Sequence, residues 1–215
     1  MPNYDYIRDP QEIYRQSFAT VRSEADFSAM DADMATVAER LIHACGMPDI
    51  LSELAWTEDA AAAGRDALNA GAPILADCRM VVEGVIRARL GQNNAVLCTL
   101  NDDRTRPLAV ELGTTRSAAA VELWRDHLDG AVVAVGNAPT ALFHLLELLA
   151  GGAPKPAVIL GFPVGFVGAA ESKEALVEAA LGVPYISLRG RRGGSAIAAA
   201  AVNALAGLSK SDTAP

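Results

Sequence analysis

The chain has 215 residues, a length that favours one domain of ordinary size over two. Apolar residues make up 51% of it and aromatic residues 5%, so the core must be built from aliphatic side chains. The net charge is −8 and no block of basic residues is present, which argues against general binding to nucleic acid or to anionic membranes. A small anionic ligand could still bind where a few arginines converge.

The start of the sequence and its cysteines point to the reducing interior of a cell. Residues 1–10 are polar and charged, which predicts no secretory signal, and no apolar run approaches the length of a membrane span. The three cysteines are widely spaced without a C-x-x-C pair, and the three histidines lack zinc-ligand spacing. We therefore predict a cytoplasmic protein with reduced thiols, no metal centre and no membrane association.

An N-terminal helical segment is predicted before the first strand. Its three helices span residues 9–25, 28–45 and 57–70. Asp9 can cap the first helix, and Pro10 suits its first position. Gly46 can end the second helix, because glycine readily adopts positive φ. Thr57 is the predicted cap of the third.

Beyond this segment, short aliphatic runs alternate with helical segments. The predicted strands are residues 73–76, 95–100, 131–135, 157–160 and 184–188. The predicted helices are residues 79–90, 115–128, 140–150, 170–181 and 195–206. This alternation predicts an α/β fold: a doubly wound, mainly parallel five-stranded sheet flanked by helices. We expect one domain over residues 1–208 and a flexible tail over residues 209–215.

His43 lies near the end of the second predicted helix, three residues after Arg40. That spacing places both side chains on one face of a helix, at the rim of its apolar stripe. An imidazole with an unperturbed pKa of about 6.5 can give or take a proton close to neutrality. The alternative is a histidine that is only packed and hydrogen-bonded.

Ligands of doubly wound sheets bind beyond the carboxyl ends of the strands, so the loops that follow strands are candidate sites. Residues 136–140 could hold an anion on free amides, or could be a well-capped strand–helix turn. Residues 161–168 carry Phe162 and Phe166, which could form the wall for a flat apolar ligand or could fold back over the end of the sheet.

Two further loops carry arginines. Residues 190–195 place Arg191 and Arg192 beside glycines at a helix start, which suits a carboxylate or phosphate but also a solvated basic loop. Arg116 falls in the first turn of a predicted helix, where its charge opposes the helix dipole and hints at pairing with an anion. Together these residues suit a flat ligand that bears several carboxylates.

Seven motifs, taken in their order and spacing, resemble the precorrin-8X methylmutase family of cobalamin biosynthesis. They are residues 5–10, 42–46, 70–77, 115–120, 135–143, 163–173 and 190–195. The resemblance covers the chain to about residue 206. It implies an isomerase that moves a methyl group between neighbouring carbons of the precorrin macrocycle to give hydrogenobyrinate, with no cofactor or metal. It also implies a parallel sheet flanked by helices and a homodimer.

The resemblance also assigns roles to residues. It implies that His43 is the acid/base residue and that Ser17 and Arg40 contact the substrate. We add Arg116 and Arg191 as candidate partners of substrate carboxylates, since guanidinium groups bind carboxylates in a bidentate manner. Arg192 and Lys173 are further candidates, and Phe162 and Phe166 could face the macrocycle.

Two other functions remain open at this point. The first is the same reaction on the cobalt-containing substrate of the anaerobic route, which these residues do not separate from the metal-free one. The second is a tetrapyrrole carrier without catalytic activity, against which the presence of His43 argues. A generic nucleotide-binding protein is disfavoured, because the sequence has no phosphate-loop motif.

Overall fold

The computed structural model describes residues 4–208, and within them six strands form one sheet in the order β1-β6-β5-β4-β2-β3. The strands are β1 (Leu54–Trp56), β2 (Ile74–Ala76), β3 (Val96–Leu97), β4 (Val132–Val135), β5 (Val158–Gly161) and β6 (Tyr185–Leu188). Strands β2 to β6 run parallel, and β1 joins the edge of the sheet antiparallel to β6. The α/β prediction is confirmed. The count of five strands was wrong, because it missed β1.

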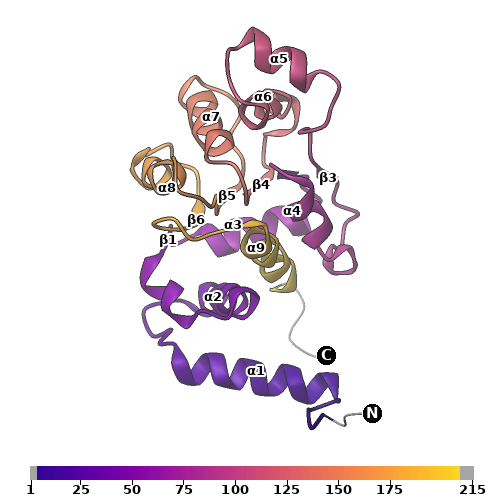
Figure 1. The fold of residues 1–215 in the computed structure, drawn as a ribbon, viewed down its shortest axis with the longest axis vertical. Coiled ribbons are helices and arrows are strands. Elements are labelled where there is room, and N and C mark those ends of the chain that lie inside the picture. Colours follow the sequence, from indigo (N-terminus) through magenta and orange to yellow (C-terminus); the bar gives the residue numbers. More distant parts are fainter. Residues whose placement is uncertain (1–3, 209–215) are drawn as a thin grey trace.

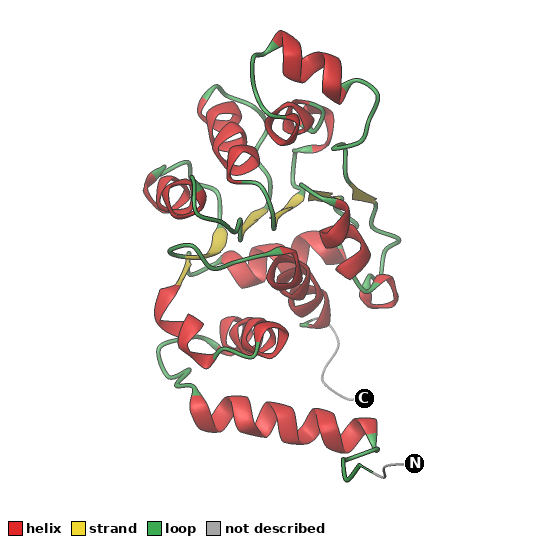
Figure 2. Cartoon of the chain, viewed as in Figure 1, coloured by secondary structure: helices red, strands yellow, loops and turns green. Residues whose placement is uncertain are grey.

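Helices cover both faces of the sheet (Figures 1 and 2). The helices are α1 (Pro10–Glu24), α2 (Ala32–Cys45), α3 (Ala60–Asn69), α4 (Arg79–Gly84), α5 (Thr105–Glu111), α6 (Arg116–Glu122), α7 (Pro139–Ala150), α8 (Ala169–Glu178) and α9 (Ser195–Gly207). Three short 3₁₀ helices also occur in the described chain: η1 (Pro48–Glu53), η2 (Arg87–Arg89) and η3 (Arg125–His127). Helices α5 to α8 lie on one face, while α2, α3, α4 and α9 lie on the other (Figure 1). Helix α1 forms an outer layer packed on α2.

Alternation along the strands supplies a core on each face of the sheet. In β4, Val132 and Ala134 face the core beside α2, α3 and α9, whereas Val133 and Val135 face the core beside α6 and α7. All four side chains are fully buried. Strands covered on both faces are expected to be continuously apolar, which is why the short aliphatic runs identified them.

The strand order places a topological switch between β2 and β4. The chain leaves β2 toward β3 on one side and, after α6, returns to β4 on the other. Such a switch opens a crevice at the carboxyl ends of the two strands, where doubly wound proteins bind ligands. Here that crevice begins at Asp77, directly after β2, and at Gly136, directly after β4.

Some predicted helices end earlier than their sequence pattern suggested. Helix α4 stops at Gly84 rather than near residue 90, because Asn203 of α9 donates to the Gly84 carbonyl and accepts from the Ile86 amide. These bonds satisfy the end of α4 from another element, which no local pattern could indicate.

Helix α3 begins at Ala60, later than predicted. Thr57 does not cap it. Its hydroxyl accepts from the Tyr185 amide, which ties the end of β1 to the start of β6.

Further elements differ from the predictions. Helix α2 begins at Ala32 rather than near residue 28, and helix α8 ends at Glu178 rather than near residue 181. Helix α5 was not predicted, since Pro107 interrupts its apolar pattern; this proline lies in the first turn, where a missing amide hydrogen costs little. The strand predicted over residues 95–100 is paired only at Val96–Leu97. The helix predicted over residues 115–128 is divided into α6 and η3. The tail predicted over residues 209–215 lies outside the described residues.

Candidate active site

The contact between α1 and α2 brings Ser17 and His43 together. The Ser17 hydroxyl lies 2.9 Å from Nδ1 of His43, and Phe18 stacks on the imidazole with ring centroids 4.9 Å apart and planes 23° apart. Phe18 is buried between the helices, whereas His43 is exposed. The ring is therefore fixed through one nitrogen and one face, and within the described residues no hydrogen bond engages Nε2.

Arg40 lies on the same face of α2, one turn before His43. Its guanidinium carbon is 4.8 Å from the centroid of the Phe18 ring and 5.3 Å from that of Tyr14. Tyr14 and Phe18 in turn contact each other, with centroids 4.5 Å apart. The aromatic pair holds the cation by its π faces, so the N–H donors at the rim of the guanidinium stay available for a carboxylate.

Capping residues set both ends of α2 and so the position of His43 in the helix. Asp31 caps the helix by accepting from the Met34 amide at 2.8 Å, and Gly46 closes it with φ +68°. His43 therefore falls in the last turn of α2, directly beside α1. An ion pair between Arg22 of α1 and Glu39 of α2 fixes the two helices against each other.

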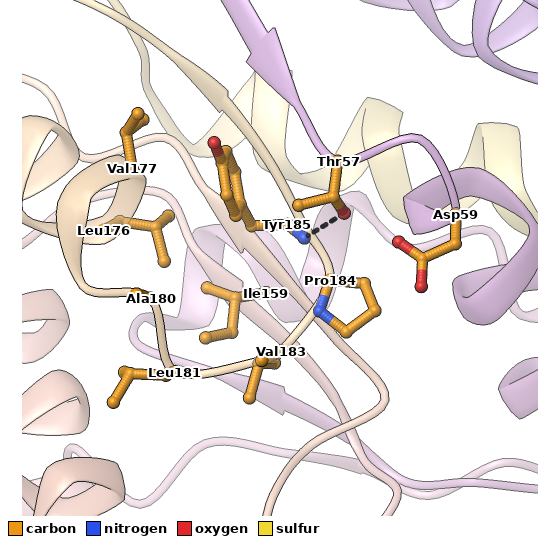
Figure 3. A pocket seen from close by; sticks show the side chains of 11 residues that line it. Thr57, Asp59, Ile159, Leu176, Val177, Ala180, Leu181, Val183, Pro184 and Tyr185 are labelled. Carbon is orange, nitrogen blue, oxygen red and sulfur yellow. Dashed lines mark hydrogen bonds between the residues drawn. The ribbon is translucent and has the colours of Figure 1, made fainter.

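A cavity of about 300 Å³ adjoins the imidazole. It is lined by Ser17, Thr20, Val21, Glu24, Ile42, His43, Gly46 and Pro48. A second cavity, of about 370 Å³, lies at the opposite, amino edge of the sheet between β1, β6 and the end of α8 (Figure 3). Its lining is mainly aliphatic, with Asp59 as its one carboxylate among the described residues. Of these two cavities, only the first is lined by a histidine.

Asp77 fills the crevice at the topological switch. Its carboxylate, only 2% exposed, accepts from the amides of Gly136, Asn137 and Ala138 at 2.9, 2.9 and 2.8 Å. Burial raises the pKa of this carboxyl, and the three amide bonds act in the opposite direction. The amides at the start of α7, which the sequence left open for an anion, are therefore occupied by the protein's own carboxylate.

The two phenylalanines after β5 have opposite positions. Phe162 is fully buried and closes the end of the sheet, whereas Phe166 is 85% exposed at the surface. The Arg191 guanidinium lies 5.6 Å from the centroid of the Phe166 ring. Phe162 therefore folds back over the end of the sheet, which was the second alternative for this loop, and Phe166 is left exposed at the surface.

The arginines of the last loop also differ from each other. Arg192 is paired with Asp49 of η1 at 2.6 Å, just after the end of α2, whereas Arg191 is exposed. Arg192 thereby connects the carboxyl edge of the sheet with the end of the helix that carries His43. Lys173, a further candidate partner of substrate carboxylates, is completely buried.

A family model described as precorrin-8X methylmutase matches residues 12–208. A protein named Precorrin-8X methylmutase from Pseudomonas aeruginosa is 65% identical over 202 residues, covering 94% of this chain and 97% of that protein. A protein of the same name from a Sinorhizobium species is 58% identical over 206 residues, covering 96% of this chain and 98% of that protein. This chain belongs to the precorrin-8X methylmutase family.

More distant members share the same fold. A crystal structure of precorrin-8x methyl mutase from Thermus thermophilus is 39% identical to this chain, with a TM-score of 0.84, and the match covers 95% of this chain and all of that one. A Cobalt-precorrin-8 methylmutase from Priestia megaterium is 35% identical over 203 residues, covering 94% of this chain and 89% of that protein. Methylmutases are isomerases, so the chain is an enzyme of that class, as predicted.

The fold brings some of the predicted site residues together and separates others. Ser17, Arg40 and His43 form one cluster between α1 and α2. Arg191 lies in the loop after β6, which Arg192 joins to η1. Arg116 begins α6, on the face of the sheet opposite α2 (Figure 1). Thr115 beside it caps α6 and lies 2.8 Å from the Thr140 hydroxyl of α7.

Sequence reasoning missed several residues that this site uses. Tyr14 and Phe18 were predicted only as one apolar face of a helix, although Phe18 packs against both Arg40 and His43. Asp77 was not singled out, although a carboxylate directly after a buried strand is a signal for that position.

Two broader features complete the description. Within residues 4–208, no group of three or more His, Cys, Asp or Glu side chains is arranged to hold a metal ion. No helix in the same part of the chain is both long and apolar enough to cross a membrane.

Proposed function

We propose that this methylmutase acts on metal-free precorrin-8X and converts it to hydrogenobyrinate. The observation that supports this choice is the high identity of two relatives that are named for precorrin-8X. Two relatives named for precorrin-8X are 65% and 58% identical to this chain, whereas one named for cobalt-precorrin-8 is 35% identical.

His43 is the acid/base residue of this proposal. Ser17 engages Nδ1, so Nε2 is the atom that donates a proton or a hydrogen bond to a ring nitrogen or to the carbon at the migration site. A methyl shift within one molecule breaks one carbon–carbon bond and forms another, so it needs no nucleophile and no redox partner. The enzyme's work is to select the reactive tautomer and to hold the ring, and orientation of this kind can lower a barrier by several kcal/mol.

Arginines hold the substrate's carboxylate arms. Arg40 presents its N–H donors beside His43, and Arg191 extends from the loop after β6 above Phe166. A flat macrocycle with acetate and propionate arms suits this combination of an exposed aromatic ring and guanidinium groups. Arg116 is a further candidate, although it lies on the other face of the sheet from His43 within one chain.

A homodimer in the cytoplasm is the second part of the proposal. The resemblance of the sequence to its family implies this assembly, and it offers one arrangement in which Arg116 and His43 could reach the same substrate. Sedimentation of the purified protein at several concentrations tests it: a mass of twice 22.4 kDa is expected. A monomer at every concentration would overturn the dimer.

Side-by-side assays test the proposed substrate. Purified protein is mixed under anaerobic conditions with precorrin-8X or with cobalt-precorrin-8, and the absorption spectrum is followed to completion. Faster conversion of the metal-free substrate, with hydrogenobyrinate as product, is expected. Faster conversion of the cobalt form would contradict the choice of substrate, and a spectral change without any product would indicate a carrier.

A further inference from the structure

Lys173 lies in the second turn of α8 and is completely buried. Its Nζ donates to the carbonyl oxygen of Arg192 at 2.6 Å. Within the described chain no carboxylate lies within ion-pair distance of this ammonium group, and the charge of the adjacent Glu174 acts on it only from farther away. Burial of a cation without an ion-pair partner is costly, and the hydrogen bond to the Arg192 carbonyl offsets part of that cost.

The carbonyl that Lys173 holds belongs to the loop between β6 and α9. This loop also contacts the loop after β5 through main-chain hydrogen bonds. The Gly194 amide donates to the Phe162 carbonyl at 2.8 Å, and the Gly165 amide donates to the Arg191 carbonyl at 3.3 Å. At Gly193 the approach is so close that a Cβ atom would lie 2.4 Å from the Phe162 carbonyl oxygen. The two loops therefore form one unit, and Lys173 of α8 holds its backbone at the Arg192 carbonyl.

Side chains on either side of Arg191 are also held by the protein. Arg189 pairs with Glu174 of α8, and Arg192 pairs with Asp49 of η1. Arg191, between these two anchors, has an exposed side chain that lies over the exposed Phe166 ring. Of the three arginines in this loop, Arg191 is the one placed to bind a ligand.

We propose that Lys173 is a positioning residue: by holding the Arg192 carbonyl it fixes the backbone that presents the Arg191 guanidinium over Phe166 to a substrate carboxylate. This inference rests on the substrate-binding role proposed for Arg191. Lys173 itself touches no substrate and acts through the loop. Its contribution should therefore disappear once Arg191 can no longer bind.

A double-mutant cycle tests this dependence. Steady-state kinetics with precorrin-8X are measured for K173M, R191M and K173M/R191M. We expect each single variant to raise KM by about tenfold with little change in kcat, as loss of one charge-assisted contact to a bound carboxylate predicts. The double variant should match R191M, because interacting residues are not additive.

The matched control is K155M, which makes the same substitution at an exposed lysine before β5, at the opposite edge of the sheet. It should leave KM unchanged. Thermal unfolding of every variant separates loop positioning from loss of fold. K173Q, which keeps a hydrogen-bond donor without the charge, serves as a second variant and should raise KM less than K173M does.

The possible results distinguish the two proposals. An unchanged KM in R191M would refute the role proposed for Arg191. A raised KM in R191M together with a wild-type KM in K173M would overturn the positioning role alone, as would additive effects in the double variant. If K173M and K173Q both fail to fold, Lys173 is a residue of the structural core and the inference is wrong.

Discussion

The α1–α2 cluster around His43 and the loops at the carboxyl edge of the sheet are held by different kinds of contact. In the cluster, side chains contact side chains near the surface: Ser17 with His43, and Arg40 with Phe18. At the edge, buried charged side chains contact the main chain, as Asp77 does at the start of α7 and Lys173 does before α9.

This difference predicts which residues affect turnover and which affect stability. A side chain in the cluster can be changed without leaving a buried group unsatisfied, so its loss should affect turnover more than stability. A buried charge at the edge bonds to main-chain groups, so its loss should affect stability or the shape of a loop. The following predictions test this division.

Replacing His43 with alanine should have the largest effect. We expect kcat to fall by about 10²–10⁴-fold, the usual contribution of a positioned acid or base, while the free energy of unfolding changes little. Kinetics with precorrin-8X and denaturant titration measure the two quantities. The H127A variant, at an exposed histidine of η3, is the control. Equal turnover in both variants would remove His43 from the mechanism.

Substituting Asp77 with asparagine should act mainly on the fold. Asparagine turns an NH₂ group toward amides that now donate to a carboxylate, and each buried unsatisfied group costs about 1–3 kcal/mol. We expect a loss of roughly 3 kcal/mol in the free energy of unfolding. D59N is the matched control, since exposed Asp59 makes no capping hydrogen bond. Similar stability in the two variants would contradict the structural role of Asp77.

The stability of the protein should also depend on pH through Lys173. Burial lowers the pKa of this lysine from 10.5 to about 8. Between these values the unfolded chain retains a proton that the folded chain has released, so the free energy of unfolding should rise with pH, by at most about 1.4 kcal/mol per unit. Denaturant titrations at several pH values in this window compare the wild type with K173M. Parallel slopes for the two proteins would contradict the assignment.

Removing the Ser17 hydroxyl should have the smallest effect. A neutral hydrogen bond contributes about 1 kcal/mol, so S17A should lower kcat by roughly three- to tenfold through looser orientation of the imidazole. S23A, on the same helix, removes a hydroxyl that bonds only to the Thr20 carbonyl and should have no effect. If S17A keeps the wild-type kcat, the hydrogen bond to Nδ1 does not orient the ring for catalysis.

The sequence predicted those parts of the fold that local patterns determine. Aliphatic runs identified β2, β4, β5 and β6, and capping residues identified the start of α1 and the end of α2. Strand β1 was missed because three residues after a 3₁₀ helix carry no strand pattern, and they are fixed only by pairing with β6, more than a hundred residues later. Helix α4 was predicted too long because its end depends on Asn203.

The site residues were also predictable only where helical spacing or the family resemblance indicated them. Helical spacing placed Arg40 beside His43, and the resemblance to the family added Ser17, which lies at hydrogen-bond distance from the ring. No local signal could separate Phe162 from Phe166, since their different exposure depends on how the two edge loops pack together. For the same reason no local signal showed that Lys173, a candidate partner of substrate carboxylates, is buried.

Chemical rescue of H43A by imidazole tests the central claim most directly. The residue is exposed and adjoins a cavity of about 300 Å³, so free imidazole can reach the space left by the side chain. If one imidazole performs the proton chemistry, the rate at which H43A converts precorrin-8X in a single turnover should rise with imidazole concentration, while the wild-type rate does not change. A rate that stays equally low at every concentration, in a variant that still binds hydrogenobyrinate, would contradict the account.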